Sequence, residues 1–405
     1  MVCHMNLMNS KGLTLVGCAV FLSFLSIKSN NLLVRQECLT HASTLETKAE
    51  EKGKKKPSLD LSDYDGPQTT YQPWPLQELP FPCVKSEANW DRVNVQRSPA
   101  KTGLLYVREM KTGSSTMAGV ILRLSHRKGE KLLSDEGPCR MRIDHSSARK
   151  LKYKDRNKDR SFLISLLRDP TKRAISQFFH FRVSDKKEDP TDENFQNYFF
   201  DDPGHRRNYF TKDLTTVPID WETADKNEVV QSIIDEYNFI GITERMDDSL
   251  VVLKMLLDLD FEDILYMSAK TNGSFTTGMI EEGVTGCIYI VPSFITDGMK
   301  EFFASDYWKR YVEFDNLLYK AAVKSLDNTI DFLGREEFEQ ELTTFKKAQK
   351  VTQERCADRT IYRCNNRGEF VGAMNSTCYM WDIGCGFDCL NEMSLDDMNL
   401  DEVAL

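Results

Sequence analysis

The sequence predicts an α/β fold with a mostly parallel sheet covered by helices. Three short apolar segments, residues 104–110, 161–167 and 237–244, have the composition of buried strands. Each is followed by a segment with helical periodicity or a helix-start signal. Parallel strands require long crossovers, usually helical, so this alternation favours a parallel sheet over hairpins.

The helices are predicted from the spacing of apolar residues. After the first strand, four of them share one helix face: Met117, Val120, Ile121 and Leu124. After the second, Pro170 suits a first helical turn, and an apolar stripe follows: Ala174, Ile175, Phe178 and Phe179. Asp247 or Asp248 is expected to cap the helix after the third strand. Residues 297–326 are expected to form a long amphipathic helical region.

The N-terminal segment contains an uncharged apolar run, residues 12–27, a little shorter than the ~20 residues of a full bilayer span. No clear small-residue cleavage site follows it. We therefore favour an uncleaved signal anchor over residues 12–28 to a cleaved signal peptide. Residues 1–11 would be a short cytoplasmic tail, and the rest of the chain would be lumenal.

The remaining organisation follows from composition. Residues 29–99 are predicted to be an extended stem, because they contain a charged run and a proline-rich stretch that could not bury a core. The α/β domain is expected over residues 100–335, and a helical, cysteine-rich region over 336–405.

Five of the eleven cysteines lie near the C-terminus: Cys356, Cys364, Cys378, Cys385 and Cys389. A zinc cluster is the alternative, but there is no CxxC pair and no nearby histidine, so disulfides of open connectivity are favoured. The sequons at Asn272 and Asn375 fit the same secretory compartment.

The formal net charge of −9 argues against general nucleic-acid binding, which requires a basic surface. Residues 123–160 are locally basic. They are interpreted either as a solvated surface or as an anion-binding face.

A loop between the first strand and its helix has the composition of an anion cradle: Lys111, Thr112, Gly113, Ser114, Ser115 and Thr116. Backbone N–H groups, hydroxyls and a helix N-terminus can together hold a phosphate or sulfate. The lysine precedes the glycine, whereas the Walker pattern places it after the glycine, so the Walker pattern is absent. A Rossmann GxGxxG is absent as well.

A second motif follows the second strand. Arg168 stands at the strand's end, and Ser176 follows about two helical turns later. Side chains at the ends of neighbouring parallel strands face one crevice, so Arg168 and Ser176 are predicted to bind a second anionic group. Arg173 is interpreted as a solvated helix residue or a salt-bridge partner.

These two motifs in this order, followed by residues 239–257, resemble the Golgi carbohydrate sulfotransferases. The resemblance covers residues 104–333 and is greatest to galactose and galactosylceramide 3-O-sulfotransferases, then to uronyl and heparan sulfate 2-O-sulfotransferases. It implies a P-loop-like sulfotransferase fold in a single-pass type II Golgi membrane protein. It also implies the donor 3′-phosphoadenosine 5′-phosphosulfate (PAPS), with its 5′-phosphosulfate on the 111–116 loop, its 3′-phosphate on Arg168 and Ser176, and no required metal.

The resemblance also implies catalytic roles. Lys111 would stabilise charge on the leaving phosphate, and a histidine between the two motifs would activate the acceptor hydroxyl, which makes His145 the candidate base. Glu109 and Asp144 are alternatives, although Glu109 is equally interpreted as a strand residue facing solvent or pairing with Arg108. His180 is expected to be a packed helix residue. A loop that could line the nucleotide or sugar site carries His205, Arg206, Arg207 and Tyr209.

The predicted function is sulfuryl transfer from PAPS to a glycan on a glycolipid, glycoprotein or glycosaminoglycan, with galactose-type acceptors favoured by the acidic net charge. A glycosaminoglycan 2-O-sulfotransferase, a nucleotide-dependent kinase and a non-catalytic lumenal glycan-binding protein are the alternatives. A homo-oligomer is allowed, but the sequence does not determine it.

Overall fold

A computed structural model describes residues 81–85, 101–133, 137–201, 207–268, 274–275, 287–371, 376–378 and 383–405. These residues all belong to one compact unit, Gln68–Leu405. The expected tail and anchor, most of the stem, and both sequon asparagines lie outside the described residues. Among the helices of the described ranges, none is long and apolar enough to cross a membrane.

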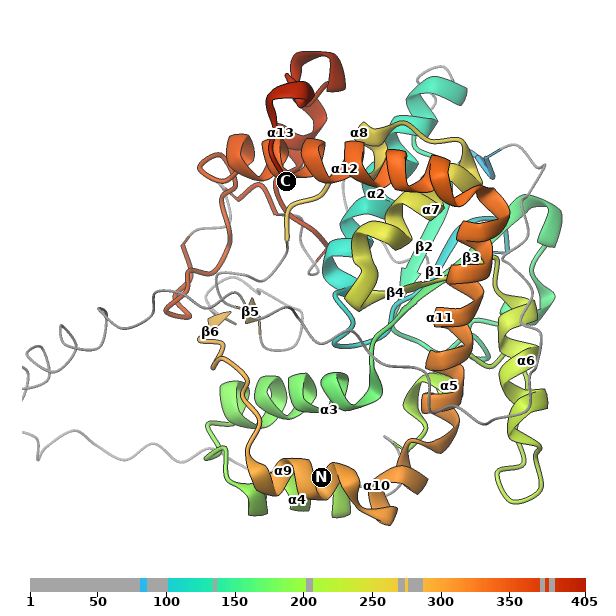
Figure 1. Cartoon of the computed structure of the whole chain (residues 1–405), viewed down its shortest axis with the longest axis vertical. Coiled ribbons are helices and arrows are strands. Elements are labelled where there is room, and N and C mark those ends of the chain that lie inside the picture. The colour runs from blue at the N-terminus through green and yellow to red at the C-terminus, as the bar shows by residue number, and fades with distance from the viewer. Residues whose placement is uncertain are drawn as a thin grey trace, which may run out of the picture. The chain divides into compact units, whose positions relative to one another are not determined.

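The sheet at the centre of the domain is parallel, as predicted (Figure 1). Its strands are β1 (Gly103–Val107), β2 (Met141–Asp144), β3 (Ser161–Leu167) and β4 (Phe239–Ile242), in the order β2-β1-β3-β4. All three neighbouring pairs are parallel. β2 was not predicted as a strand, and β1 ends before residues 108–110, which belong to the following loop.

The order of the strands creates a switch point between β1 and β3. The chain leaves β1 toward β2 at one edge and leaves β3 toward β4 at the other edge. The segments after β1 and β3 therefore diverge over a crevice at the carboxyl ends of these strands, which is where parallel α/β sheets bind ligands.

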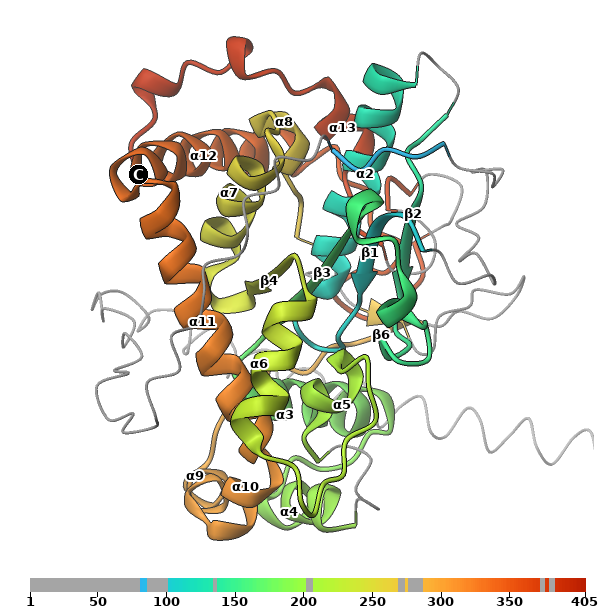
Figure 2. The same ribbon diagram turned by 90° about the vertical axis from the view of Figure 1, so that its right-hand side faces the viewer.

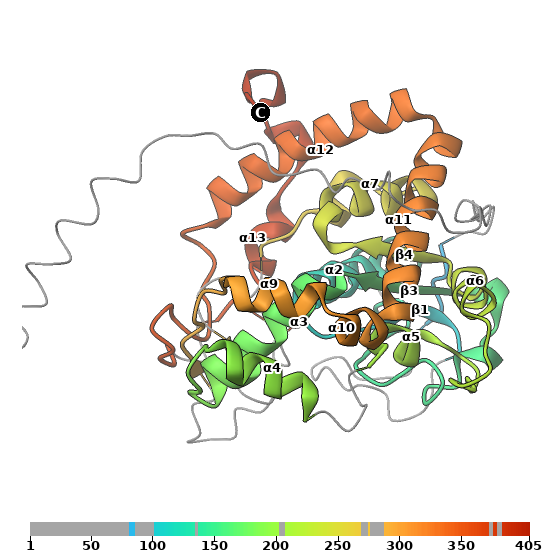
Figure 3. The same ribbon diagram turned by 60° about the horizontal axis from the view of Figure 1, so that its bottom comes forward.

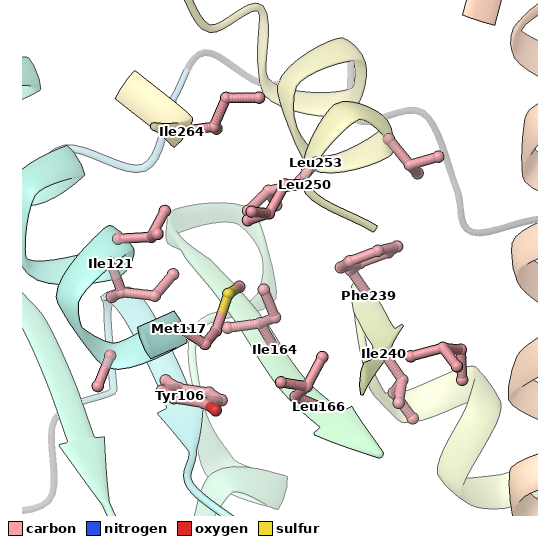
Figure 4. Close-up of a cluster of buried hydrophobic side chains, with 14 of the residues drawn as sticks. Tyr106, Met117, Ile121, Ile164, Leu166, Phe239, Ile240, Leu250, Leu253 and Ile264 are labelled. Atoms are coloured by element: carbon pink, nitrogen blue, oxygen red, sulfur yellow. The ribbon is translucent and has the colours of Figure 1, made fainter. Parts of the chain in front are cut away.

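One face of the sheet is covered by α2 (Ser114–Leu132), α7 (Met246–Leu257) and α8 (Phe261–Ile264), and α12 (Arg335–Cys356) packs on α7. Figure 4 shows side chains of α2, α7 and α8 gathered over the strands. Met117 and Ile121 of the predicted apolar face of α2 are buried there, beside Ile164 and Leu250. This burial confirms the predicted first helix.

The predicted cap of α7 is wrong. Arg245 occupies the N-cap position, and Asp247 and Asp248 lie in the first turn. The short 3₁₀ turn η4 (Thr243–Arg245) joins β4 directly to α7. The two carboxylates instead stand at the positive end of the helix, and Asp248 accepts from Arg245 Nε at 2.8 Å.

Helices α5 (Tyr209–Leu214), α6 (Lys226–Glu236) and α11 (Glu313–Leu333) pack against one another, and α11 also contacts β4, α7 and α12 (Figures 2 and 3). The sequence predicted a single amphipathic helical region over 297–326, but the structure has three helices. The helical conformation is interrupted at Ser305, between α9 (Asp297–Ala304) and α10 (Asp306–Tyr311), and again at Val312, before α11. Ser305 begins α10 by accepting from Trp308 N at 3.2 Å.

A second, aromatic core lies beyond the end of the sheet (Figure 1). It joins α3 (Pro170–Phe178), its π-helical continuation η3 (Phe179–Asp185), α4 (Asp192–Phe200), α9 and α10. Pro170 begins α3, as predicted, after the N-cap Asp169. His180 is buried in η3, as the sequence predicted.

The remaining elements are short. β5 (Ser274–Phe275) and β6 (Cys287–Ile288) form an antiparallel pair, and α13 (Phe387–Glu392) lies near the C-terminus. The other 3₁₀ turns are η1 (Tyr153–Asp155), η2 (Lys158–Arg160), η5 (Leu395–Asp397) and η6 (Leu400–Glu402).

Four disulfides join described cysteines: Cys83–Cys139, Cys287–Cys364, Cys356–Cys389 and Cys378–Cys385. They confirm the predicted disulfides and exclude the zinc interpretation of the five C-terminal cysteines. The first one joins Cys83, within the expected stem, to Cys139 of the α/β domain. Residues 81–85 are fastened to the domain, since Arg140 N also donates to Val84 O at 2.6 Å.

The cysteine-rich region packs directly behind the start of α2. Gly384 N donates to Ser115 O at 2.9 Å, and a Cβ at Gly119 would lie 2.7 Å from Gly384 Cα. We expect Gly119→Ala to destabilise the domain by about 1–3 kcal/mol, because the backbone of residue 384 must move. Thermal unfolding tests this, with Glu130→Ala at an exposed position of the same helix as a control that changes a side chain without a clash. An unchanged melting temperature in Gly119→Ala would contradict this packing.

Candidate active site

The loop between β1 and α2 has an unusual backbone. Lys111 and Gly113 both have positive φ angles, 67° and 73°. Alternating conformations of this kind turn successive N–H groups to one side, as in anion-binding nests. Gly113 is the N-cap of α2 and has no side chain with which to cap it, and no acidic residue lies in the first turn. The positive end of α2 is therefore open to an anion.

Contacts from other elements hold this loop. Met110 N donates to the Tyr209 hydroxyl at 3.2 Å, and the Thr243 hydroxyl lies 2.7 Å from Thr112 O. The same hydroxyl lies 2.8 Å from Leu167 O, so Thr243 joins the loop to the end of β3. The left-handed backbone conformation costs a lysine about 1–2 kcal/mol, and it persists only where contacts from neighbouring groups hold the backbone in place.

The second predicted motif lies beside the first. Arg168 Nη1 donates to Lys111 O at 3.1 Å, so the structure brings the ends of β1 and β3 together as predicted. Ser176, partly exposed on α3, stands about 9 Å along the helix from Pro170, given 1.5 Å per residue. Burial lowers the pKa of Arg168, an effect that the charges of Glu244 and Asp169 oppose. A bound anion would further stabilise this partly buried cation.

Sequence reasoning missed the role of Glu244, two residues after the end of β4. Its carboxylate accepts from Asp169 N at 3.2 Å and from the Tyr319 hydroxyl at 3.1 Å. It also lies 3.9 Å from Arg168 Nε and 4.0 Å from Lys172 Nζ. Glu244 thus fixes the start of α3 and one side of the Arg168 guanidinium. Its position after a strand end was the available signal.

His145 follows β2 and is exposed at the same edge of the sheet. Its Nδ1 lies 2.7 Å from Arg108 O. Because a carbonyl only accepts, the proton is on Nδ1 and the lone pair is on Nε2 in the neutral ring. This tautomer suits a general base acting through Nε2.

The alternative bases are placed differently. Asp144 pairs with Arg142 at 2.7 Å and accepts from Ser146 N at 2.8 Å. Burial would raise its pKa, but these hydrogen bonds hold the pKa below the ordinary value. Glu109 does not face solvent, as one interpretation had it, but is 1% exposed. Burial, aided by the charge of Asp213, raises its pKa well above the ordinary value.

Tyr209 and Arg173 are also more buried than the sequence suggested. Tyr209 is 8% exposed and Arg173 is 5% exposed, with the guanidinium carbon 4.0 Å from the centre of the tyrosine ring. Tyr209 therefore lies inside, between the loop and α3, instead of lining a substrate surface. Arg173 is not solvated, because stacking on an aromatic ring compensates for its lost water. Arg207 is exposed, and His205 and Arg206 lie outside the described residues.

This buried cluster predicts a pH dependence of stability. Burial raises the pKa of Asp213 from 3.8 to about 6, although a hydrogen bond from Tyr209 and the charge of Arg173 oppose the shift. The folded chain keeps a proton that the unfolded chain releases, so this stabilisation is complete below pH 3.8 and is lost as pH rises to about 6. Glu109 acts in the same direction.

Thermal unfolding measured from pH 4 to 7 tests this. The melting temperature of Asp213→Asn is expected to fall less over this interval than that of the unchanged protein. Parallel curves for the two proteins would contradict the assignment.

Much of the basic stretch 123–160 is neutralised within the domain. Arg123 donates to Leu265 O and Glu262 O, while other cations pair with carboxylates: Arg127 and Lys128 with Asp263, Lys131 with Asp260, and Arg156 and Lys158 with Glu236. Four exposed cations in the segment after His145 have no ion pair among the described residues: Arg149, Lys150, Lys152 and Lys154. The stretch is therefore partly structural and partly a small basic surface.

Comparison with known proteins adds a family to this geometry. A family model described as "Sulfotransferase family" matches residues 98–313, more than half of the 405 residues. The match includes the Lys111 loop, His145 and the Arg168 motif. No curated protein matches the chain.

Proposed function

The chain belongs to the sulfotransferase family, and from this premise we propose that it transfers the sulfuryl group of PAPS to a hydroxyl of a galactose-type glycan in the Golgi lumen. The observation that carries the proposal is the hydrogen bond between Arg168 Nη1 and Lys111 O at 3.1 Å. Two anion-binding motifs in contact across the β1–β3 crevice suit one nucleotide with an anionic group at each end.

The residues present fit such a donor. The backbone of the loop and the open N-terminus of α2 would hold the 5′-phosphosulfate, with hydroxyls from Ser114, Ser115 and Thr116. Arg168 and Ser176 would hold the 3′-phosphate, for which the guanidinium fork is suited. When bound, PAPS supplies an activated sulfuryl group with a phosphate leaving group.

The proposed catalytic roles follow from position. Lys111, at the front of the loop, stabilises the negative charge that builds on the leaving phosphate. His145 accepts the proton of the acceptor hydroxyl at Nε2, while Arg108 O holds the Nδ1 proton and fixes the ring. Lys111 and His145 would thus serve the leaving oxygen and the acceptor oxygen, respectively, of a sulfuryl group supplied by bound PAPS.

A polyanionic acceptor, such as a uronyl glycosaminoglycan, is the second candidate. The exposed Arg149, Lys150, Lys152 and Lys154, which follow His145, favour it. The internal pairing of the other cations and the net charge of −9 favour a neutral galactose terminus. We retain the galactose-type acceptor as the main proposal.

We also propose that the protein is a single-pass type II Golgi membrane protein with a lumenal catalytic domain. The four disulfides support an oxidising compartment. Residues 12–28 would anchor the chain, and a homo-oligomer is compatible with this arrangement.

Labelled PAPS, incubated with the full chain and a panel of glycolipid, glycoprotein and glycosaminoglycan acceptors, tests the proposal. Label is expected on galactose-terminated acceptors. Transfer only to glycosaminoglycans would select the second candidate. Transfer to none of the acceptors would contradict the proposed sulfotransferase activity. A nucleotide-dependent kinase would bind ATP in preference to adenosine 3′,5′-bisphosphate, and a non-catalytic glycan-binding protein would bind acceptors without labelling them.

A further inference from the structure

Arg168 contacts both sides of the crevice. Nη1 donates to Lys111 O, and Nε lies 3.9 Å from Glu244. The side chain is 29% exposed, so part of it still faces solvent. The carbonyl that it holds belongs to Lys111, whose φ of 67° is unfavourable for a lysine.

We propose that Arg168, beyond binding a phosphate, is a positioning residue for Lys111. The guanidinium holds the Lys111 peptide in its left-handed conformation and so aims the side chain. Recognition at one end of the donor is thereby coupled to the placement of the catalytic lysine at the other end. This inference rests on the proposed function.

The coupling has a structural route. Leu167, the residue before Arg168, and Thr112, the residue after Lys111, share the Thr243 hydroxyl at 2.8 and 2.7 Å. The two motifs are therefore joined twice: directly between Arg168 and Lys111, and through Thr243 between the residues next to them in the chain. Glu244 fixes the other side of the guanidinium. A displacement of Arg168 would therefore reach the loop through two contacts, the hydrogen bond to Lys111 O and the shared Thr243 hydroxyl.

Two nucleotides separate phosphate binding from positioning. Adenosine 3′,5′-bisphosphate engages both motifs, whereas adenosine 5′-phosphate lacks the group that Arg168 would bind. Both affinities are measured by competition on the full chain and on Arg168→Lys, which keeps the charge but loses the planar fork. Arg245→Lys is the matched control, because Arg245 also follows a strand end but pairs with Asp248 and Asp327.

Arg168→Lys is expected to lower the affinity for adenosine 5′-phosphate about tenfold and to lower the affinity for the bisphosphate by a larger factor. The control should leave both affinities within twofold. If the variant weakens only the bisphosphate, Arg168 is a phosphate ligand alone and the inference is wrong, while the proposed function stands. No detectable 5′-phosphate binding by the unchanged protein also counts against the inference, because the loop would not be shaped in advance.

If the unchanged protein binds neither nucleotide, or binds both equally, the proposed function itself fails. Thr243→Val provides a second variant, since it acts on the loop without removing any proposed phosphate ligand. Thr243→Val is expected to lower the affinities for both nucleotides by the same factor, about three- to tenfold. Unchanged affinities in a folded Thr243→Val protein would overturn the coupling.

Discussion

Lys111→Ala is expected to lower kcat by about 10²–10³-fold, the usual effect of removing one group that stabilises charge developing in the transition state. Lys111 stands where the β1–α2 loop meets Arg168, and its left-handed backbone is held by neighbouring elements. The donor would still bind through the loop backbone, so KM for PAPS should rise much less than kcat falls. Steady-state rates with labelled PAPS measure both quantities.

Lys131→Ala is the matched control, because Lys131 is in the last turn of α2, the helix that follows the Lys111 loop, and pairs with Asp260. It should keep full activity. Retention of more than a tenth of kcat by Lys111→Ala would show that Lys111 does not take part in sulfuryl transfer.

Asp315→Ala is expected to lower the free energy of unfolding by about 3–5 kcal/mol. Asp315, 2% exposed on α11, accepts hydrogen bonds from Phe210 N, Thr211 N and the Thr211 hydroxyl at 2.9–3.1 Å. Its removal leaves three buried donors without partners, each costing about 1–3 kcal/mol with partial relaxation. Chemical denaturation measures the loss.

The effect should also reach the site. The donors that Asp315 holds begin α5, and Tyr209 of this helix accepts from Met110 N beside Lys111. The exposed Asp331→Ala, on the same helix, should cost less than 0.5 kcal/mol. A loss below 1 kcal/mol in Asp315→Ala would mean that Asp315 does not hold α5 in place.

The sequence was sufficient to predict the parallel sheet and the meeting of the two strand-end segments, because strand–helix alternation and strand-end residues are local patterns. β2 was missed because Arg142 and Asp144 interrupt its apolar character, which an edge strand tolerates. The three helices in 297–333 were merged because their apolar periodicity continues across the breaks at Ser305 and Val312.

Other errors concern polar residues whose burial depends on distant segments. Arg173 resembles a solvated helix residue until Tyr209, 36 positions later, supplies its ring. Glu109 is buried by α3 and α5, and Glu244 acts on a helix that begins 74 residues earlier. No local pattern records such contacts, because they arise only when the strand ends are brought together.

A crystal structure of the full chain with adenosine 3′,5′-bisphosphate is the most direct measurement of the central claim. We predict one nucleotide per chain, its 5′-phosphate on the backbone N–H groups of residues 112–116 and its 3′-phosphate within hydrogen-bonding distance of Arg168 and Ser176. A nucleotide bound elsewhere, or one whose 3′-phosphate does not contact Arg168, would contradict the account.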